Sequence, residues 1–193
     1  MTMINRFFIR FTTFDFVIIA LLSACGIATK PFVRFLAQIF TGTLIPIGTV
    51  AGIFYMLWIV LACAIVKKRG TAILVGIVQS VLVVVFDMLG NRGLANLLVY
   101  VVPGVTLELA MLAFPHYVST LFSSFTAGAV CNATGSFIVS VVFMRLAFIP
   151  MLVSLIVSGI FGGIGGIVGY KLYAVVNSLK GTAREYSEGE TQD

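Results

Sequence analysis

The sequence has few charged residues. Only 10% of its 193 residues are charged and 60% are hydrophobic, whereas ordinary soluble domains carry roughly 25% charged residues. A soluble domain of this size leaves much of its surface in water and could not bury so much apolar area. The composition therefore excludes a soluble enzyme or a soluble nucleic-acid-binding domain, and it predicts a chain embedded in a lipid bilayer.

Residues that carry catalysis or bind metals are also scarce. A single histidine, His116, cannot build a histidine-rich metal site. No Gly-rich loop with the Walker spacing and its lysine is present, so we expect that this chain does not itself hydrolyse nucleotides. Cys25, Cys63 and Cys131 lie in apolar runs without metal-ligand spacing, which indicates small core residues. We predict a protein that is not an enzyme and that has no cofactor and no metal.

Apolar runs divide the chain into six predicted membrane-spanning helices, since about 20 apolar residues cross a bilayer. Lys30-Pro31 interrupts the first run, and we expect a kink or break there because proline lacks an N–H and disfavours helix in the preceding residue. The sequence therefore predicts an all-α integral membrane protein. Its single transmembrane domain covers 1–180, and the polar segment 181–193 is expected to be a disordered cytoplasmic tail. The predicted spans are 14–40, 50–66, 71–89, 94–114, 117–148 and 151–179.

The basic residues indicate how the helices are oriented. Six crossings place both termini on one side of the membrane. Most of the basic residues that give the chain its formal net charge of +5 lie on that side. Because Lys and Arg collect in cytoplasmic segments, both termini are predicted to be cytoplasmic. Lys30 and Arg34 are assigned to neither side. The residues on the terminal side are Arg6, Arg10, Lys67, Lys68, Arg69, Lys171, Lys180 and Arg184, and those opposite are Arg92 and Arg145.

Polar side chains inside membrane spans are costly, so each is a candidate for ligand binding. Glu108 is the clearest candidate, because no charged residue lies near it in the sequence. The alternative for Glu108 is a neutral carboxyl group that bonds to a backbone carbonyl. Gln79 and Asn132 either contact a ligand or form hydrogen bonds between helices.

Aromatic residues lie in the predicted outer halves of several spans. Tyr55, Trp58 and Tyr100 either belong to the aromatic belt at the membrane interface or, if a pocket opens outward, stack on a flat heterocycle. The predicted substrate-binding set consists of Glu108, Asn132, Gln79, Tyr55, Trp58, Asn96 and Tyr100.

Small residues recur at four-residue spacing in two spans. Ala20, Ala24 and Ala28 form one row, and Gly162 with Gly166 and Gly165 with Gly169 form another. Residues four apart share a helix face, so each row lets another helix approach closely. The approaching helix belongs either to this chain or to a separate membrane protein.

The predicted helices, the cytoplasmic termini, the outward polar residues and the alanine row together resemble the S components of energy-coupling factor (ECF) transporters, small membrane proteins that capture vitamins. In that family an alanine-xxx-alanine motif in the first helix docks on the transmembrane T component. Ala20-Leu21-Leu22-Ser23-Ala24 is similar to this motif, and Ala28 extends it. The likeness implies partner docking by Ala20, Ala24 and Ala28.

Residues 53–113 resemble the branch associated with thiamin and its hydroxymethylpyrimidine precursor. The likeness rests on an aromatic-rich second span that ends in Lys67-Lys68-Arg69-Gly70-Thr71-Ala72, on Leu89-Gly90-Asn91 with Gly93 after it, and on Gly104 four residues before Glu108. Glu108 falls where this branch keeps a glutamate in the binding region. The chain departs from the branch by holding Gln79, Phe86 and Ser140 where acids can occur. The pocket is therefore expected to be less negative, which puts a cationic thiazolium ligand in doubt.

The resemblance implies a multi-pass protein of a bacterial or archaeal plasma membrane whose partners are a T component and two cytoplasmic ATPases, with no nucleic acid. The expected ligand is thiamin, hydroxymethylpyrimidine or a related small vitamin. The loop 41–48 would act as a lid, and the loaded protein would topple in the membrane to release its ligand. The alternatives are a self-sufficient channel or homo-oligomeric pore, with the glycine row as its interface, and a scaffold protein without a ligand.

Overall fold

The computed structural model describes residues 11–41, 47–86 and 95–189, and within these ranges it contains helices and no strands. This confirms the all-helical fold predicted from the sequence. The helices are α2 (Thr13–Thr41), α3 (Ile47–Val66), α4 (Thr71–Val85), α5 (Ala95–Met111), α6 (Leu121–Ile138) and α7 (Phe148–Gly189), and a short π-helix, η1 (Val139–Phe143), follows α6.

Several helices are suited to a bilayer. Among the described residues, α2, α3, α6 with η1, and α7 contain segments long and apolar enough to cross a membrane, and α4 and α5 are shorter apolar helices. The α7 segment is the longest of these at 32 residues. The chain is a multi-pass membrane protein.

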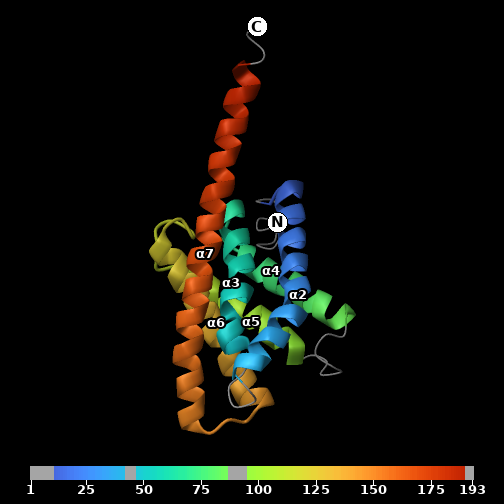
Figure 1. Ribbon diagram of the computed structural model, residues 1–193, viewed down its shortest axis with the longest axis vertical. Coiled ribbons are helices and arrows are strands. Elements are labelled where there is room, and N and C mark those ends of the chain that lie inside the picture. The colour runs from blue at the N-terminus through green and yellow to red at the C-terminus, as the bar shows by residue number, and fades with distance from the viewer. Residues whose placement is uncertain (1–10, 42–46, 87–94, 190–193) are drawn as a thin grey trace, which may run out of the picture.

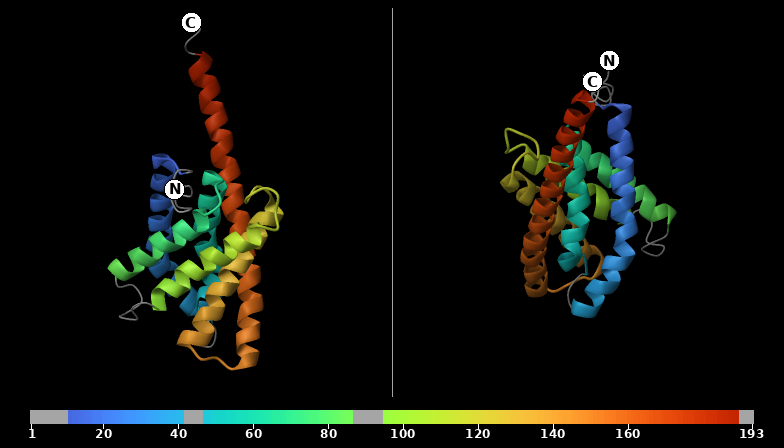
Figure 2. Two further views of the ribbon diagram at one scale, coloured as in Figure 1. Left: turned by 180° about the vertical axis from the view of Figure 1, so that it is seen from behind. Right: turned by 45° about the horizontal axis from the view of Figure 1, so that its top comes forward.

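Helix α3 lies at the centre of the bundle and contacts α2, α4, α6 and α7. Helices α4 and α5 pack side by side and run obliquely to the others (Figure 2). We call the end of the bundle at which α2 begins the basal end, and the opposite end, predicted to face outward, the outer end. The last part of α7 projects beyond the basal end (Figure 1).

The proline in the first span kinks the chain without ending the helix. Pro31 lies inside the continuous helix α2, and the ribbon of α2 changes direction in its outer part (Figures 1 and 2). A proline removes one backbone donor and crowds the preceding turn, which bends a helix. Of the two alternatives predicted for this position, the structure contains the kink.

Glycines allow α7 to approach its neighbours closely. A Cβ atom added to Gly162 would lie 2.4 Å from the carbonyl oxygen of Gly128 in α6, and one added to Gly165 would lie 2.4 Å from that of Ile53 in α3. These distances are far below van der Waals contact, so a larger residue cannot occupy either position without moving backbone. The glycine row therefore serves packing within the chain.

Two predicted segments differ from the structure or lie outside it. Helix α7 continues to Gly189, whereas disorder was expected from residue 181. Few residues in this stretch break a helix, and Ala183, Arg184 and Glu185 favour one. The predicted lid, 41–48, lies mostly outside the described residues, and α3 already begins at Ile47.

Candidate functional site

Gln79 and Trp58 meet at the surface of α2. A Cβ atom added to Gly26 would lie 2.8 Å from Gln79 Nε2 and 3.4 Å from Trp58 Cβ, so the absence of a side chain there makes room for both. Gln79 is only 7% exposed. Helices α2, α3 and α4 therefore bring a buried amide and an indole ring together.

A lysine and two tyrosines extend this group. The Nζ atom of Lys30 lies 3.9 Å from the centre of the Tyr100 ring and 5.3 Å from that of Tyr55. Tyr55 precedes Trp58 by three residues on α3, and Lys30 follows Gly26 by four on α2, so each pair shares a helix face. Lys30, Tyr55, Trp58, Gln79 and Tyr100, which come from four helices, are called the outer cluster below.

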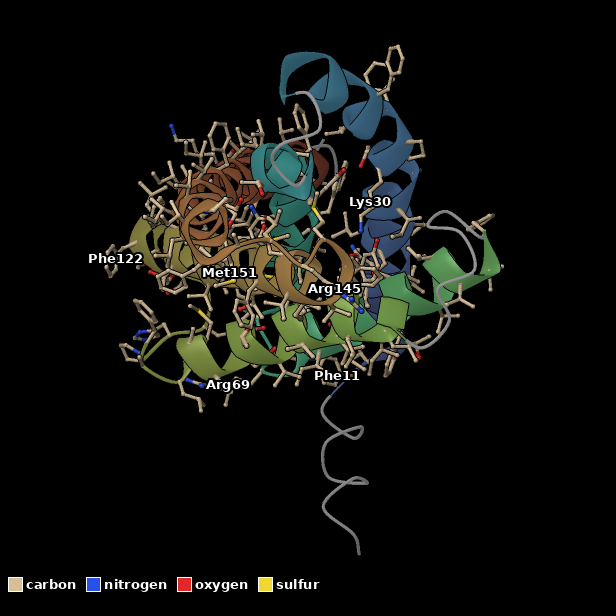
Figure 3. All side chains as sticks on the ribbon, turned by 90° about the horizontal axis from the view of Figure 1, so that it is seen from below. Phe11, Lys30, Arg69, Phe122, Arg145 and Met151 are labelled. Atoms are coloured by element: carbon tan, nitrogen blue, oxygen red, sulfur yellow. The ribbon has the colours of Figure 1, made fainter. Side chains whose placement is uncertain are left out.

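The cluster lies in the outer half of the bundle. Asp15 pairs with Lys68 at the basal end, and Lys30 follows Asp15 by 15 residues, which is about 22 Å along a helix. Seen from the outer end, Lys30 is on the side of α2 that faces the other helices, whereas Phe122 points away from the rim of the bundle (Figure 3).

The outer cluster offers three kinds of contact. Its aromatic rings can stack on a flat molecule, the Gln79 amide can donate and accept hydrogen bonds, and the Lys30 ammonium adds a positive charge. A few polar groups among apolar and aromatic side chains are typical of sites for small organic ligands.

Three buried hydroxyl groups have no hydrogen-bond partner among the described residues: Ser23, Thr49 and Ser140. Ser23 lies on α2 three residues before Gly26 and is fully buried, so it shares the inward face that carries Lys30. Buried polar groups in proteins are nearly always bonded. An unsatisfied hydroxyl on this face is thus a further polar group near the cluster.

Asn132 connects three helices. Its side-chain nitrogen donates to the carbonyl oxygens of Ser158 in α7, at 2.8 Å, and Thr49 in α3, at 3.3 Å. The side chain is almost fully buried and lies against Gly52. Of the two roles proposed from the sequence, these contacts correspond to hydrogen bonding between helices.

Glu108 lies away from the outer cluster, toward the basal end. It follows Tyr100 by eight residues on α5, about 12 Å along the helix axis. Its Oε1 atom accepts hydrogen bonds from the Ala72 backbone N–H, at 3.0 Å, and from the Tyr117 hydroxyl, at 2.6 Å. Glu108 therefore satisfies one of the free N–H groups at the start of α4. These partners could not be predicted from the sequence around Glu108, because they come from other segments of the chain.

The Tyr117 hydroxyl is suited to donate to this carboxyl group. Burial, and then the neighbouring Cys63 and Glu108, raise the pKa of the Tyr117 phenol above its ordinary value. The phenol therefore keeps its proton and remains a hydrogen-bond donor to Glu108.

Of the remaining predicted residues, Asn96 lies in the first turn of α5, and its side chain is outside the described part of the structure. Ala20, Ala24 and Ala28 are all exposed on α2. No other helix of the described chain covers them, so internal packing does not explain the alanine row.

Lys30 was not predicted as a site residue, because Lys30-Pro31 was interpreted as an interruption of a span and the charge of Lys30 was assigned to neither side of the membrane. The spacing of Lys30 in the sequence did indicate which face of the helix it occupies. Lys30 shares a helix face with Ser23 and Gly26, whereas Ala20, Ala24 and Ala28 occupy another.

The chain is similar to known transport proteins. The family model described as ABC-type cobalt transport system, permease component, matches residues 14–134, which is more than half of the chain. A crystal structure described as that of an S-component of an ECF transporter superposes with a TM-score of 0.65 over 93% of this chain and 98% of the other, at 19% sequence identity. No protein of curated function matches the sequence.

Proposed function

Because the chain belongs to the family of ABC-type cobalt transport system permease components, we propose that it is the substrate-capturing S component of an ECF-type uptake transporter. The observation that carries the proposal is the outer cluster, in which side chains from four helices converge within a fold shared with an S component. In this proposal the chain binds its ligand from the outer side and performs no chemistry on it.

We propose a small organic ligand, namely thiamin, hydroxymethylpyrimidine or a related small vitamin. Tyr55, Trp58 and Tyr100 would hold a flat ring, and Gln79 would bond to its polar edge. The resemblance of residues 53–113 to the thiamin branch supports this choice. Glu108 and Asn132 act in this proposal by holding helices in place.

A cobalt ion is the alternative cargo that the family description suggests. Divalent cobalt prefers imidazole and carboxylate ligands. Within the described residues, no three His, Cys, Asp or Glu side chains are grouped to hold a metal ion. Lys30 also adds a positive charge to the outer cluster, which disfavours a metal cation there and, among the proposed ligands, disfavours the cationic thiamin relative to the uncharged hydroxymethylpyrimidine. The side chains of the outer cluster therefore favour an organic ligand over a cobalt ion.

The proposed partners are a transmembrane T component and two cytoplasmic ATPases. The exposed Ala20, Ala24 and Ala28 offer a smooth surface on which a helix of the T component can dock. Exposed Val17 and Leu21 flank this row and widen its apolar surface. The pore alternative loses its proposed interface, because the glycine row of α7 packs against α3 and α6.

Native mass spectrometry of the full chain, purified in mild detergent, tests the proposal. We expect a retained organic molecule of vitamin size with one bound per chain. Retention of a cobalt ion without an organic ligand would favour the alternative cargo, and a chain that binds neither after incubation with a cell extract would contradict a capture function.

A further inference from the structure

We propose that Lys30 binds an anionic group of the ligand, a carboxylate or a phosphate. The outer cluster would then select a flat ring that carries such a group. This inference rests on the proposed function and narrows its ligand class.

Lys30 lies on the inward face of α2. Ser23, Gly26 and Ile27 on this face are buried, whereas Ala24 and Ala28 on another are exposed. A lysine in a membrane span commonly extends its side chain toward the aqueous surface. Here the ammonium group instead lies over the rings of Tyr55 and Tyr100, and Lys30 is on the side of α2 that faces the other helices (Figure 3).

The two tyrosine rings compensate only part of the cost of placing this charge at lipid depth. Contact with an aromatic face is a modest attraction, whereas a charged side chain in a membrane span is costly unless an opposite charge pairs with it. In the described part of the chain the one ion pair joins Lys68 and Asp15 at the basal end. No carboxylate there pairs with Lys30.

The acids within the described parts of α2, α3, α4 and α5, Asp15 and Glu108, are engaged elsewhere. The Oε1 atom of Glu108 accepts hydrogen bonds from Ala72 and Tyr117, and Asp15 pairs with Lys68. An anion supplied by the ligand would complete the charge balance of the outer cluster. The same arrangement would repel a metal cation, and among the ligands proposed above it disfavours thiamin itself, because the thiazolium ring carries a positive charge.

The test uses the fluorescence of Trp58, the single tryptophan of the chain, in the full-length detergent-solubilised protein. Two pairs of probes each differ in charge and share a ring: hydroxymethylpyrimidine with its phosphate ester, and nicotinamide with nicotinate. The variants are Lys30→Met, which removes the charge, and Lys30→Arg, which keeps it. Lys171→Met on the exposed surface of α7 is the control.

We expect the anionic member of at least one pair to bind the natural chain roughly ten- to hundred-fold more tightly, as for a hydrogen bond to a charged group. Lys30→Met should remove this preference, Lys30→Arg should keep most of it, and Lys171→Met should leave it unchanged. The pair that responds distinguishes a phosphate from a carboxylate. Melting temperatures of all variants show whether they fold.

Four results would overturn the inference. The first is that the neutral members bind as tightly as the anionic ones. The second is that Lys30→Met keeps the preference while Arg145→Gln removes it. The third is that no member of either pair binds. The fourth is expected if Lys30 serves only to pair with Asp87, which lies outside the described residues: Lys30→Met and Asp87→Asn both lower the melting temperature and neither changes the affinity ratio. In each case an organic ligand retained in native mass spectrometry would leave the proposed function standing.

Discussion

Replacement of Glu108 separates a role in stability from a role in binding. The Oε1 atom of Glu108 accepts two hydrogen bonds, from the Ala72 N–H and the Tyr117 hydroxyl. Glu108→Ala would leave the Ala72 N–H without an acceptor and the Tyr117 hydroxyl with only the weaker Cys63 Sγ acceptor, at 3.3 Å. Because an unsatisfied donor costs about 1–3 kcal/mol, we expect the free energy of unfolding to fall by at least about this amount. Glu108→Gln retains an acceptor oxygen and should cost less.

A double-mutant cycle with Tyr117→Phe assigns part of this loss to one contact. Phenylalanine removes the hydroxyl donor and keeps the ring, so Glu108→Ala should cost less in a Tyr117→Phe background than in the natural chain. A coupling of about 0.5–3 kcal/mol is expected for residues in direct contact. Thermal unfolding in detergent measures stability, and Trp58 fluorescence measures ligand affinity on the same preparation.

The result that would refute this reasoning is specific. If Glu108→Ala weakened ligand binding at least ten-fold while the melting temperature stayed unchanged, Glu108 would belong to the binding site rather than to the start of α4. The hydrogen bonds to Ala72 and Tyr117 would then contribute little to the fold.

Three further substitutions test other parts of the molecule. Ala24→Trp should block transport by the assembled transporter and leave ligand binding by the isolated chain unchanged; loss of both would show that this surface is needed within the chain. Gly26→Ala would place a Cβ atom 2.8 Å from Gln79 Nε2, so it should lower ligand affinity with little change in melting temperature, and unaltered affinity would remove Gln79 from the site. Gly162→Leu would force side-chain atoms against the Gly128 backbone and should abolish the folded protein, seen as loss of the monodisperse peak in size-exclusion chromatography; a stable variant would disprove the close packing of α6 and α7.

The sequence was sufficient to predict the helices because the signal for a membrane helix is local. Long apolar runs bounded by charged and turn residues define a span without any knowledge of its neighbours. The kink at Pro31 was predictable for the same reason. The continuation of α7 to Gly189 was not, because a polar composition does not exclude a helix.

The candidate site was predicted in part. Tyr55, Trp58, Gln79 and Tyr100 were chosen for their type and depth, and the structure brings these four together. The rotation of each helix about its axis, which turns Lys30 inward, depends on packing between distant segments. The same is true of Glu108, whose partners Ala72 and Tyr117 come from other parts of the chain.

The central claim is that a small organic ligand binds at the outer cluster, and Trp58 fluorescence tests it most directly. The small molecules released by denaturing the purified protein would be added back to ligand-free chain. We predict a saturable change in Trp58 emission that Gln79→Ala weakens and that Lys171→Met leaves unchanged. Two results would place the ligand elsewhere and contradict the claim. In the first, mass spectrometry shows that the ligand binds again but Trp58 emission does not change; in the second, the Gln79→Ala variant binds the ligand as tightly as the natural chain does.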